Sequence, residues 1–413
     1  MTARDVVEPR AEDLRYLPPP PAPVLDLHPS RMTVARAVAT GLSVLRPNLT
    51  AGRVHDRLCA WSGRAECVLT ASGRTALRLA LVDRGAGPGS EVVLSTFNCP
   101  AVVDAVLTSG AKPVLVDFDP VTGPAFDSVP LRGRVVVLTN GLGLDEWAAH
   151  GERITARGGT VVLDLAQAVP APGVLRRYSG TDFPIVLSFG IGKPLGGLGG
   201  GALLTATRRP GRPGPTPGAG PATLVRAVSG RMRLDAPARV RNALARKQSR
   251  APGWSTTKAD HLPAVRGPVP DGGPSPWQQA AAAVLLDSAE SVRHKMIDVH
   301  DRVRTLLHES LRACELVPAA PDLGPHLDLI VARPEDRFRF GQELAARGIP
   351  ATWNYYPLHR TPAYAGDVAA PEVDRLWRRV LSVPKQPQPR LTADLLAGGI
   401  LAADRAISGG RRG

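Results

Sequence analysis

Short apolar segments alternate with helical segments between Val68 and Val186, and this alternation constrains the fold more than any other feature. Segments rich in Val, Ile and Leu predict strands, and segments with apolar residues at helical spacing predict helices. Strands are expected at residues 68–70, 91–94, 112–117, 135–139, 160–163 and 185–188, and helices from residue 73, at 100–109 and at 145–157. Strands that are almost entirely apolar are typical of a parallel sheet covered on both faces. We therefore expect an α/β fold with a large, mostly parallel sheet.

The chain divides into three predicted parts. Residues 1–50 form a proline-containing N-terminal arm with a helical pattern at 32–45. Residues 51–276 form the large domain, with an insertion rich in Pro, Gly and Arg at 207–275. Residues 277–413 begin with a long helix and continue as a smaller α/β domain. Within this last part the long helix is expected at 277–311, a strand at 327–331 and further helices at 338–347 and 392–406.

The net charge of +14 is concentrated in one segment. Residues 207–270 carry thirteen Arg and Lys against two Asp, so this segment accounts for +11 of the total. A run of charge is most often a solvated face, and the next interpretation is binding of an anionic substrate or cofactor such as a nucleotide diphosphate. Nucleic acid is unlikely as a partner, because the segment has a single aromatic residue, Trp254, and no known nucleic-acid-binding motif.

The four cysteines and the apolar runs indicate the compartment. No CxxC motif and no Cys/His cluster with zinc spacing occurs, so a disulfide framework and a bound metal are not expected. No apolar run approaches the roughly 18 residues of a membrane span, and residues 1–13 lack the apolar core of a signal peptide. We expect a cytoplasmic protein that does not contact a membrane.

Two residues at the ends of predicted strands point to covalent cofactor chemistry. Asp164 ends an apolar strand, where its carboxylate either caps the next turn or needs a cationic partner. Lys193, one of only six lysines, lies in a glycine-rich loop after the strand at 185–188. This loop does not match a P-loop, because Leu187 and Pro194 replace the required Gly and Ser/Thr. A lysine in apolar surroundings near a carboxylate suits Schiff-base chemistry, and the carboxylate suits the pyridine nitrogen of pyridoxal phosphate (PLP).

A third segment, residues 70–77, reads as a strand, a tight turn at Ser72-Gly73 and the start of a helix. The free N–H groups at such a helix start can bind a phosphate group. The same pattern is also that of an ordinary helix cap, so the segment gains weight only in combination with Asp164 and Lys193.

Taken together, the chain resembles the DegT/StrS-type nucleotide-sugar aminotransferases, which are PLP-dependent enzymes of fold type I. Seven motifs carry the resemblance in order between about residues 50 and 405. They are Ser72-Gly73, Gly87-Pro88-Gly89-Ser90-Glu91, Gly110-Ala111-Lys112-Pro113-Val114 with Asp117, Asp164-Leu165-Ala166-Gln167, Ser188-Phe189 with Lys193, Gln279-Ala280-Ala281, and Tyr355-Tyr356-Pro357-Leu358-His359 with Pro362 and Tyr364.

The resemblance implies a role for each matched residue around the cofactor. Lys193 would form the Schiff base with PLP and then carry a proton between two carbon atoms. Asp164 would pair with the pyridine nitrogen, and Gln167 would contact the ring hydroxyl. In the dehydratase branch of the family a histidine replaces the lysine, so Lys193 indicates amino transfer.

The resemblance also implies the phosphate and substrate contacts. Ser188 and the backbone of Gly73 and Arg74 would hold the phosphate. Tyr355 and His359 would approach the substrate from the small domain, and a homodimer with a shared active site is expected.

The chain departs from the family pattern at three places. Cys99 stands where an aromatic residue usually stacks on the PLP ring, so Cys99 packs there, Phe97 takes its place, or Cys99 is a core thiol. Residues 272–276 lack the usual Asn or Arg that reaches the partner subunit's phosphate, and an arginine from residues 226–250 is a candidate substitute. Asn354 replaces a frequent histidine.

The predicted function is transfer of an amino group, from glutamate as the family implies, to a keto or aldehyde group of a nucleotide-linked sugar in a biosynthetic pathway. Two alternatives remain. The chain could be a PLP enzyme acting on a cyclitol or an amino acid-derived precursor with another outcome, such as elimination. It could also be a non-catalytic PLP-binding regulatory protein.

Overall fold

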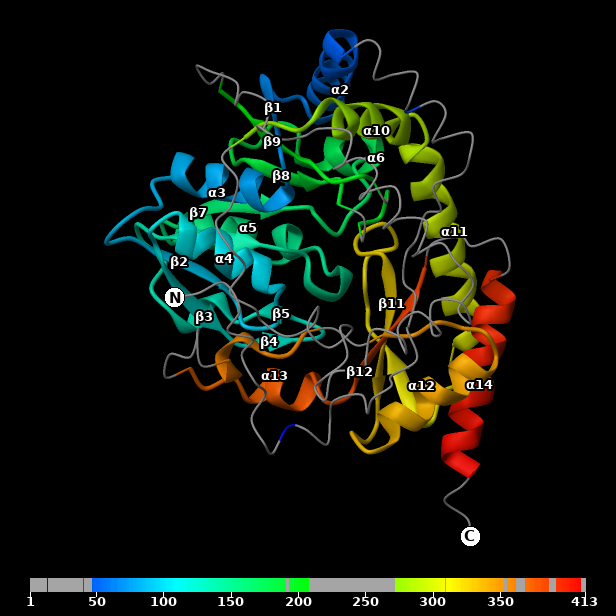
Figure 1. The fold of residues 1–413 in the computed structure, drawn as a ribbon. Coiled ribbons are helices and arrows are strands. Elements are labelled where there is room, and N and C mark those ends of the chain that lie inside the picture. Colours follow the sequence, from blue (N-terminus) through cyan, green and yellow to red (C-terminus); the bar gives the residue numbers. More distant parts are fainter. Residues whose placement is uncertain are drawn as a thin grey trace, which may run out of the picture.

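The computed structural model describes residues 13, 40, 47–190, 193–195, 197–207, 272–308, 310–352, 355–361, 368–385 and 391–409. The predicted helix at 32–45 and nearly all of the basic insertion lie outside these residues. Figure 1 shows a large sheet with its helices and, beside it, a smaller sheet with its own helices.

The large sheet has seven strands in the order β1-β9-β8-β7-β6-β2-β3. Strands β8, β7, β6, β2 and β3 are mutually parallel, whereas β9 runs antiparallel between β1 and β8. The strands are β1 Glu66–Thr70, β2 Glu91–Ser95, β3 Lys112–Val116, β6 Val135–Leu138, β7 Thr160–Asp164, β8 Ile185–Ser188 and β9 Gly201–Thr205; the short pair β4 Phe118–Asp119 and β5 Gly123–Pro124 stands apart. The expected fold class, with a mostly parallel sheet, is confirmed.

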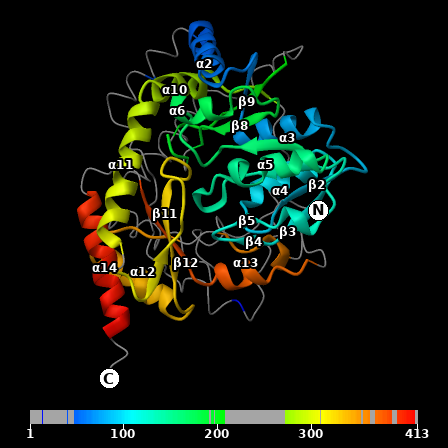
Figure 2. The ribbon, with the colours of Figure 1, turned by 180° about the vertical axis from the view of Figure 1, so that it is seen from behind.

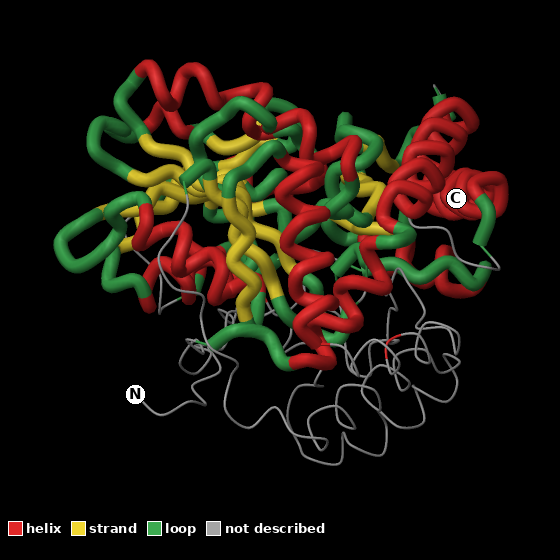
Figure 3. The backbone as a smooth tube through the Cα atoms, turned by 90° about the horizontal axis from the view of Figure 1, so that it is seen from above, coloured by secondary structure: helices red, strands yellow, loops and turns green. Residues whose placement is uncertain are grey.

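Alternate residues of each strand enter two separate cores, one on each face of the sheet. In β6, Val136 and Leu138 face one core, and Val135 and Val137 face the other. Helices α3 Gly73–Asp83 and α4 Pro100–Thr108 cover one face. Helices α2 Pro47–Ser62, α5 Glu146–Ala156, α6 Pro172–Leu175 and α10 Pro276–Leu286 cover the other (Figure 2). Figure 3, seen from above, shows helices on both sides of the strands. Burial on both faces explains why these strands are apolar throughout rather than alternating.

A three-stranded antiparallel sheet, β10-β11-β12, forms the smaller unit. One face packs against α11, α12 and α14, while the other turns toward the large sheet. The elements are α11 Ala289–Leu307, β10 Cys314–Leu316, β11 His326–Val331, α12 Asp336–Ala346, the short helix η5 Leu358–Arg360, α13 Pro371–Leu376, β12 Val380–Pro384 and α14 Ala393–Gly409.

The structure differs from the sequence expectations at two places that matter for the site. The long helix expected at 277–311 is two helices, α10 and α11, because the backbone leaves the α conformation at Ser288 (φ −106°, ψ 3°). The N–H of Ser288 turns to the carbonyl of Leu285 (3.1 Å). Strand β9 follows the glycine-rich loop of Lys193 and is not among the strands expected above. No helix among the described residues is long and apolar enough to cross a membrane.

Candidate active site

Five of the nine predicted site residues line one pocket between the two sheets: Cys99, Asp164, Gln167, Lys193 and Tyr355. The large sheet contributes segments that follow the carboxyl ends of β2, β6, β7 and β8. The smaller unit contributes the start of β11 and Tyr355. Open α/β sheets bind ligands at this end of the strands, so the location agrees with that of an active site.

Asp164 and Lys193 enter the pocket from the neighbouring strands β7 and β8 and their loops. The Asp164 carboxylate is buried and accepts one hydrogen bond, 2.8 Å long, from the backbone N–H of Ala166. Burial raises the pKa of Asp164, and the positive charge of Lys193 partly opposes this shift. The Lys193 ammonium has no hydrogen-bond partner among the described residues. A buried acid in one pocket with a lysine side chain suits a ligand that has a cationic nitrogen and an electrophilic carbon.

Three residues form a narrow cradle beside the lysine loop. A methyl group at Gly73 would lie 2.7 Å from Cβ of Ser188, and one at Gly201 would lie 2.6 Å from the backbone nitrogen of Gly73. Gly73 begins α3, whose N-cap is Ser72, so the first N–H groups of the helix have no partner within it. A cradle of bare backbone, a serine hydroxyl and a helix N-terminus fits a phosphate group. The structure therefore has the features that PLP needs: a lysine, an acid for the ring nitrogen and a phosphate site.

Arg74 contributes only its backbone to this cradle. Its guanidinium turns to Asp104 on α4, with a nitrogen–oxygen distance of 3.1 Å, and both side chains are largely buried. The side chain therefore links α3 and α4, and only the backbone of Arg74 is left for the phosphate contact that the sequence predicts.

Tyr355 crosses from the smaller unit to the large one. Its hydroxyl accepts a 2.8 Å hydrogen bond from the amide of Gln167, and its ring packs edge-on against Phe97. Burial, with the nearby Cys99 and carboxylates, raises the pKa of the phenol, so it stays protonated and can donate to a ligand. Phe97 also stacks on Phe118, so its ring is held in place, and Cys99 lines the pocket as the N-cap of α4.

Backbone strain is concentrated in the pocket wall. Among the described residues, the non-glycine positions with positive φ are Asn140 (52°), Leu142 (52°) and Tyr355 (23°), and all three line the pocket. Such conformations cost on the order of 1–3 kcal/mol each and gather at functional sites. The wall is thus held in a shape that the surrounding fold enforces.

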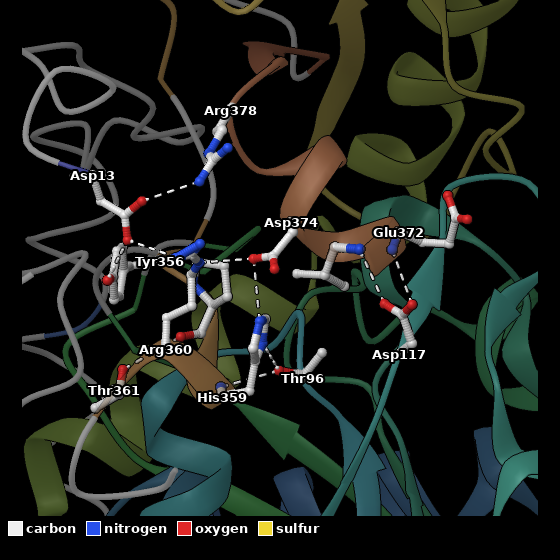
Figure 4. Close-up of polar contacts among 12 residues, drawn as sticks. Asp13, Thr96, Asp117, Tyr356, His359, Arg360, Thr361, Glu372, Asp374 and Arg378 are labelled. Carbon is white, nitrogen blue, oxygen red and sulfur yellow. Dashed lines mark hydrogen bonds and ion pairs between the residues drawn. The ribbon is translucent and has the colours of Figure 1, made fainter. Parts of the chain in front are cut away.

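The structure does not bring His359 into the pocket (Figure 4). Its Nδ1 lies 2.7 Å from the hydroxyl of Thr96, and its Nε2 lies 3.2 Å from the Asp374 carboxylate. Both ring nitrogens are therefore engaged within the protein. Asp374 also accepts from Arg360, which reaches Asp13 in the N-terminal arm. This network, drawn in Figure 4, holds the segment that follows Tyr355.

Several pocket residues escaped the sequence prediction. They are polar and follow strand ends or begin a strand of the smaller unit: Asn98, Thr139, Asn140, His326 and Asp328. Polar residues just beyond β2 and β6 could have been noticed by the rule that located Asp164. Nothing in the sequence shows that β11 turns His326 and Asp328 toward the large sheet.

The start of α10 lies against the same region. Ser275 caps the helix in a capping box with Gln278, and the backbone N–H of Ala71 donates to the carbonyl of Gly272 (3.0 Å). The segment 272–276 is thus used to dock α10 on the Ser72-Gly73 turn. The arginines of residues 226–250 lie outside the described residues.

Comparisons with known proteins agree with this geometry. Residues 49–207 match the DegT/DnrJ/EryC1/StrS aminotransferase family. The chain is 32% identical over 180 residues to UDP-2-acetamido-2-deoxy-3-oxo-D-glucuronate aminotransferase of Pseudomonas aeruginosa, an alignment covering 42% of this chain and 49%, about half, of that protein. It is 27% identical to dTDP-3-amino-3,4,6-trideoxy-alpha-D-glucose transaminase of Streptomyces venezuelae, over 86% of each chain. The structure of NtdA from Bacillus subtilis with bound cofactor PMP is similar, with a TM-score of 0.65 and 16% identity over 90% of this chain and 83% of that one.

The fold is thus that of the PLP-dependent enzymes of fold type I, and the pocket fits such a cofactor. Residues 49–207 match the DegT/DnrJ/EryC1/StrS aminotransferase family, and relatives named as aminotransferases align with this part of the chain and beyond it.

Proposed function

We propose that this protein transfers an amino group from glutamate to a keto or aldehyde carbon of a nucleotide-linked sugar in a biosynthetic pathway. The observation that carries the proposal is that Lys193, whose side-chain nitrogen has no hydrogen-bond partner among the described residues, lines one pocket with the buried carboxylate of Asp164. The match of residues 49–207 to the family supports the reaction type. The names of three relatives, which act on UDP- and dTDP-linked sugars, support the substrate class.

The position of each predicted site residue gives it a role around the cofactor. Bound PLP supplies the electron sink that lets a carbon–hydrogen bond next to nitrogen be broken. Lys193 would hold the cofactor covalently and then move the proton, and Asp164 would pair with the ring nitrogen. Ser188 and the backbone of Gly73 and Arg74 hold the phosphate. Gln167 would contact the ring hydroxyl, and Tyr355 would approach the substrate from the smaller unit.

Other parts of the proposal concern the organisation of the protein. We assign the PLP site to a large domain of residues 51–276 and part of the substrate wall to residues 277–413. His359 takes a positioning role, because it fixes the segment that carries Tyr355 through Thr96 and Asp374. We further propose a cytoplasmic homodimer, in which an arginine from residues 226–250 reaches the partner's phosphate.

The test is a half-reaction with purified holoenzyme and glutamate, followed by absorbance. A transaminase converts the PLP form to the pyridoxamine form, and a keto sugar then restores it. The Lys193→Ala variant should bind PLP without this conversion. Retention of full transamination by that variant, or a wild-type protein that stays in the PLP form with every amino donor, would exclude the proposal and favour a binding-only role.

A further inference from the structure

Asp328 is a second buried acid in the pocket, and the proposed reaction does not use it. Along β11, Leu327, Leu329 and Val331 point into the core of the smaller unit. His326 and Asp328 occupy the opposite face of the strand and line the pocket. Alternation along a strand therefore directs the Asp328 side chain toward the large sheet.

One oxygen of the Asp328 carboxylate accepts a hydrogen bond from a described residue, and the other does not. Ser382, which pairs directly with Asp328 across β11 and β12, donates its hydroxyl to Oδ1. Oδ2 has no hydrogen-bond partner among the described residues. Asp328 is only 4% exposed, so this oxygen has little water around it apart from the pocket. A buried carboxylate oxygen without a donor is costly unless a ligand supplies one.

The surroundings keep Asp328 partly charged. Burial raises its pKa to about 6, against the opposing effects of Ser382 and Lys385. Lys385 is completely buried, and its ammonium donates to the carbonyls of Ala320 (3.2 Å) and Leu323 (2.9 Å) rather than directly to Asp328. Lys385 thus holds the 320–323 loop and supplies a nearby positive charge, while Asp328 Oδ2 stays open to the pocket.

The chemistry of this wall limits what can lie against it. Apart from Lys193, the described residues that line the pocket include no lysine and no arginine. While Asp328 is ionised, a ketone oxygen, a carboxylate or a phosphate placed against Oδ2 would meet an acceptor and gain no hydrogen bond. Only a group with its own polar hydrogen, such as a hydroxyl or an ammonium group, satisfies this position.

We propose that Asp328 is a specificity-determining residue of the acceptor site, whose Oδ2 accepts a hydrogen bond from a hydroxyl or ammonium group on the sugar ring. The inference rests on the proposed function, since it names the acceptors that the same site prefers. Sugars that carry a free donor near the reacting carbon are favoured over their deoxygenated analogues.

The experiment compares two acceptors that differ only in ring hydroxyls. The pyridoxamine form of the holoenzyme is mixed with dTDP-4-dehydro-6-deoxy-D-glucose or with dTDP-4-dehydro-2,3,6-trideoxy-D-glucose, and binding and single-turnover rates are measured. The 3-amino analogue of the trideoxy sugar is the third probe. For wild type, kcat/KM should be about 10- to 100-fold higher for a probe that carries a hydrogen-bond donor than for the trideoxy sugar, mainly through a lower KM.

Two variants distinguish a hydroxyl from an ammonium group as the hydrogen-bond donor to Asp328. Asp328→Leu should abolish the preference for both donor-bearing probes. Asp328→Asn keeps the contact with Ser382 through its amide oxygen and places an NH2 group where Oδ2 was. A hydroxyl can accept from that group, so part of the preference for the hydroxylated sugar should remain, whereas the preference for the ammonium-bearing sugar should be lost. Asp404→Asn is the matched control, because Asp404 is another buried acid of the smaller unit and does not line the pocket. The Asp404→Asn protein should show the same preference among the probes as wild type.

The outcomes also distinguish this inference from the proposed function. Suppose that wild type exchanges amino groups with glutamate. The inference is then wrong, while the proposed reaction stands, if wild type shows no preference between the probes or binds none of them. The same holds if Asp328→Leu keeps the preference. If wild type fails the glutamate half-reaction, the proposed function itself fails. The rate of the glutamate half-reaction and the melting temperature of each Asp328 variant show whether a lost acceptor preference reflects misfolding. If Asp328→Leu is misfolded, the acceptor preference of the folded Asp328→Asn protein tests the inference.

Discussion

The amide of Gln167 donates a hydrogen bond to the hydroxyl of Tyr355, 188 residues further along the chain. This contact joins the loop after β7 to the segment that follows β11 and α12, so it connects the two sheets across the pocket. It leaves the phenolic hydrogen of Tyr355 available to a ligand, because the phenol accepts from Gln167 and stays protonated.

Replacing Tyr355 with Phe should therefore impair the acceptor half-reaction more than the donor one. The ring keeps its contact with Phe97, and only the hydroxyl is lost. We expect a fall in kcat/KM for the keto sugar of about 10-fold, the effect of one neutral hydrogen bond in a buried site. The measurement is stopped-flow absorbance of both half-reactions, and equal effects on the two would contradict a contact with the acceptor.

Asp164→Asn tests the acid that faces the cofactor ring. An amide keeps the size of the side chain but cannot hold a protonated ring nitrogen by charge. The donor half-reaction should slow by on the order of 100-fold or more, with PLP still bound through Lys193. Cofactor content measured by absorbance is the control, and a variant with normal rates would show that Asp164 only caps its turn.

Gly73→Ala tests the phosphate cradle. The added methyl group would lie 2.7 Å from Cβ and 2.9 Å from Oγ of Ser188, so the cradle must open. PLP affinity should fall by about 10-fold or more, since the helix N-terminus and the serine would no longer meet the phosphate together. Gly398→Ala in α14 is the matched control, because a methyl group there has no neighbour within 4 Å. Fluorescence titration of the apoenzyme with PLP measures both, and equal affinities would disprove the cradle.

Glu146 should make stability depend on pH in a defined range. This buried carboxyl accepts from the backbone N–H groups of Thr139 and Gly141, both 2.8 Å away, and so supports a wall of the pocket. Burial raises its pKa from 4.5 to about 7. The folded protein then binds the proton more tightly than the unfolded chain, so stability falls as pH rises from 4.5 to 7, by on the order of 3 kcal/mol for this group.

Chemical denaturation across this pH range can isolate the effect. Glu146→Gln removes the titration, so the difference in unfolding free energy between wild type and variant should change with pH below 7 and level off above it. A difference that is constant from pH 4.5 to 7 would show that Glu146 titrates normally.

The sheet was predictable because its chemistry is local. A run such as residues 135–138 is apolar because both faces are buried, and the carboxyl ends of such runs led directly to Asp164 and to the loop of Lys193. The resemblance to a family then supplied Gln167, Tyr355 and the phosphate residues in sequence order.

What could not be predicted depends on how distant segments pack. His359 lies in the same short motif as Tyr355, yet the positive φ of Tyr355 and the bonds to Thr96 and Asp374 turn it away from the pocket. Asp328 sits in a strand whose pattern does not reveal which face is covered by helices. Its place in the pocket follows only from the docking of the smaller sheet against the large one.

Strand β9 lies between β1 and β8, although it follows β8 in the chain and β1 lies at the sheet's edge. While the ribosome is making the protein, β1 therefore has to wait for its partner until Thr205 has been synthesised. Gly201, at the start of β9, also closes the cradle at Gly73. A nascent chain that ends before β9 can contain Lys193 and Asp164 and still lack the finished cradle, so the phosphate site is complete only after β9 has joined the sheet.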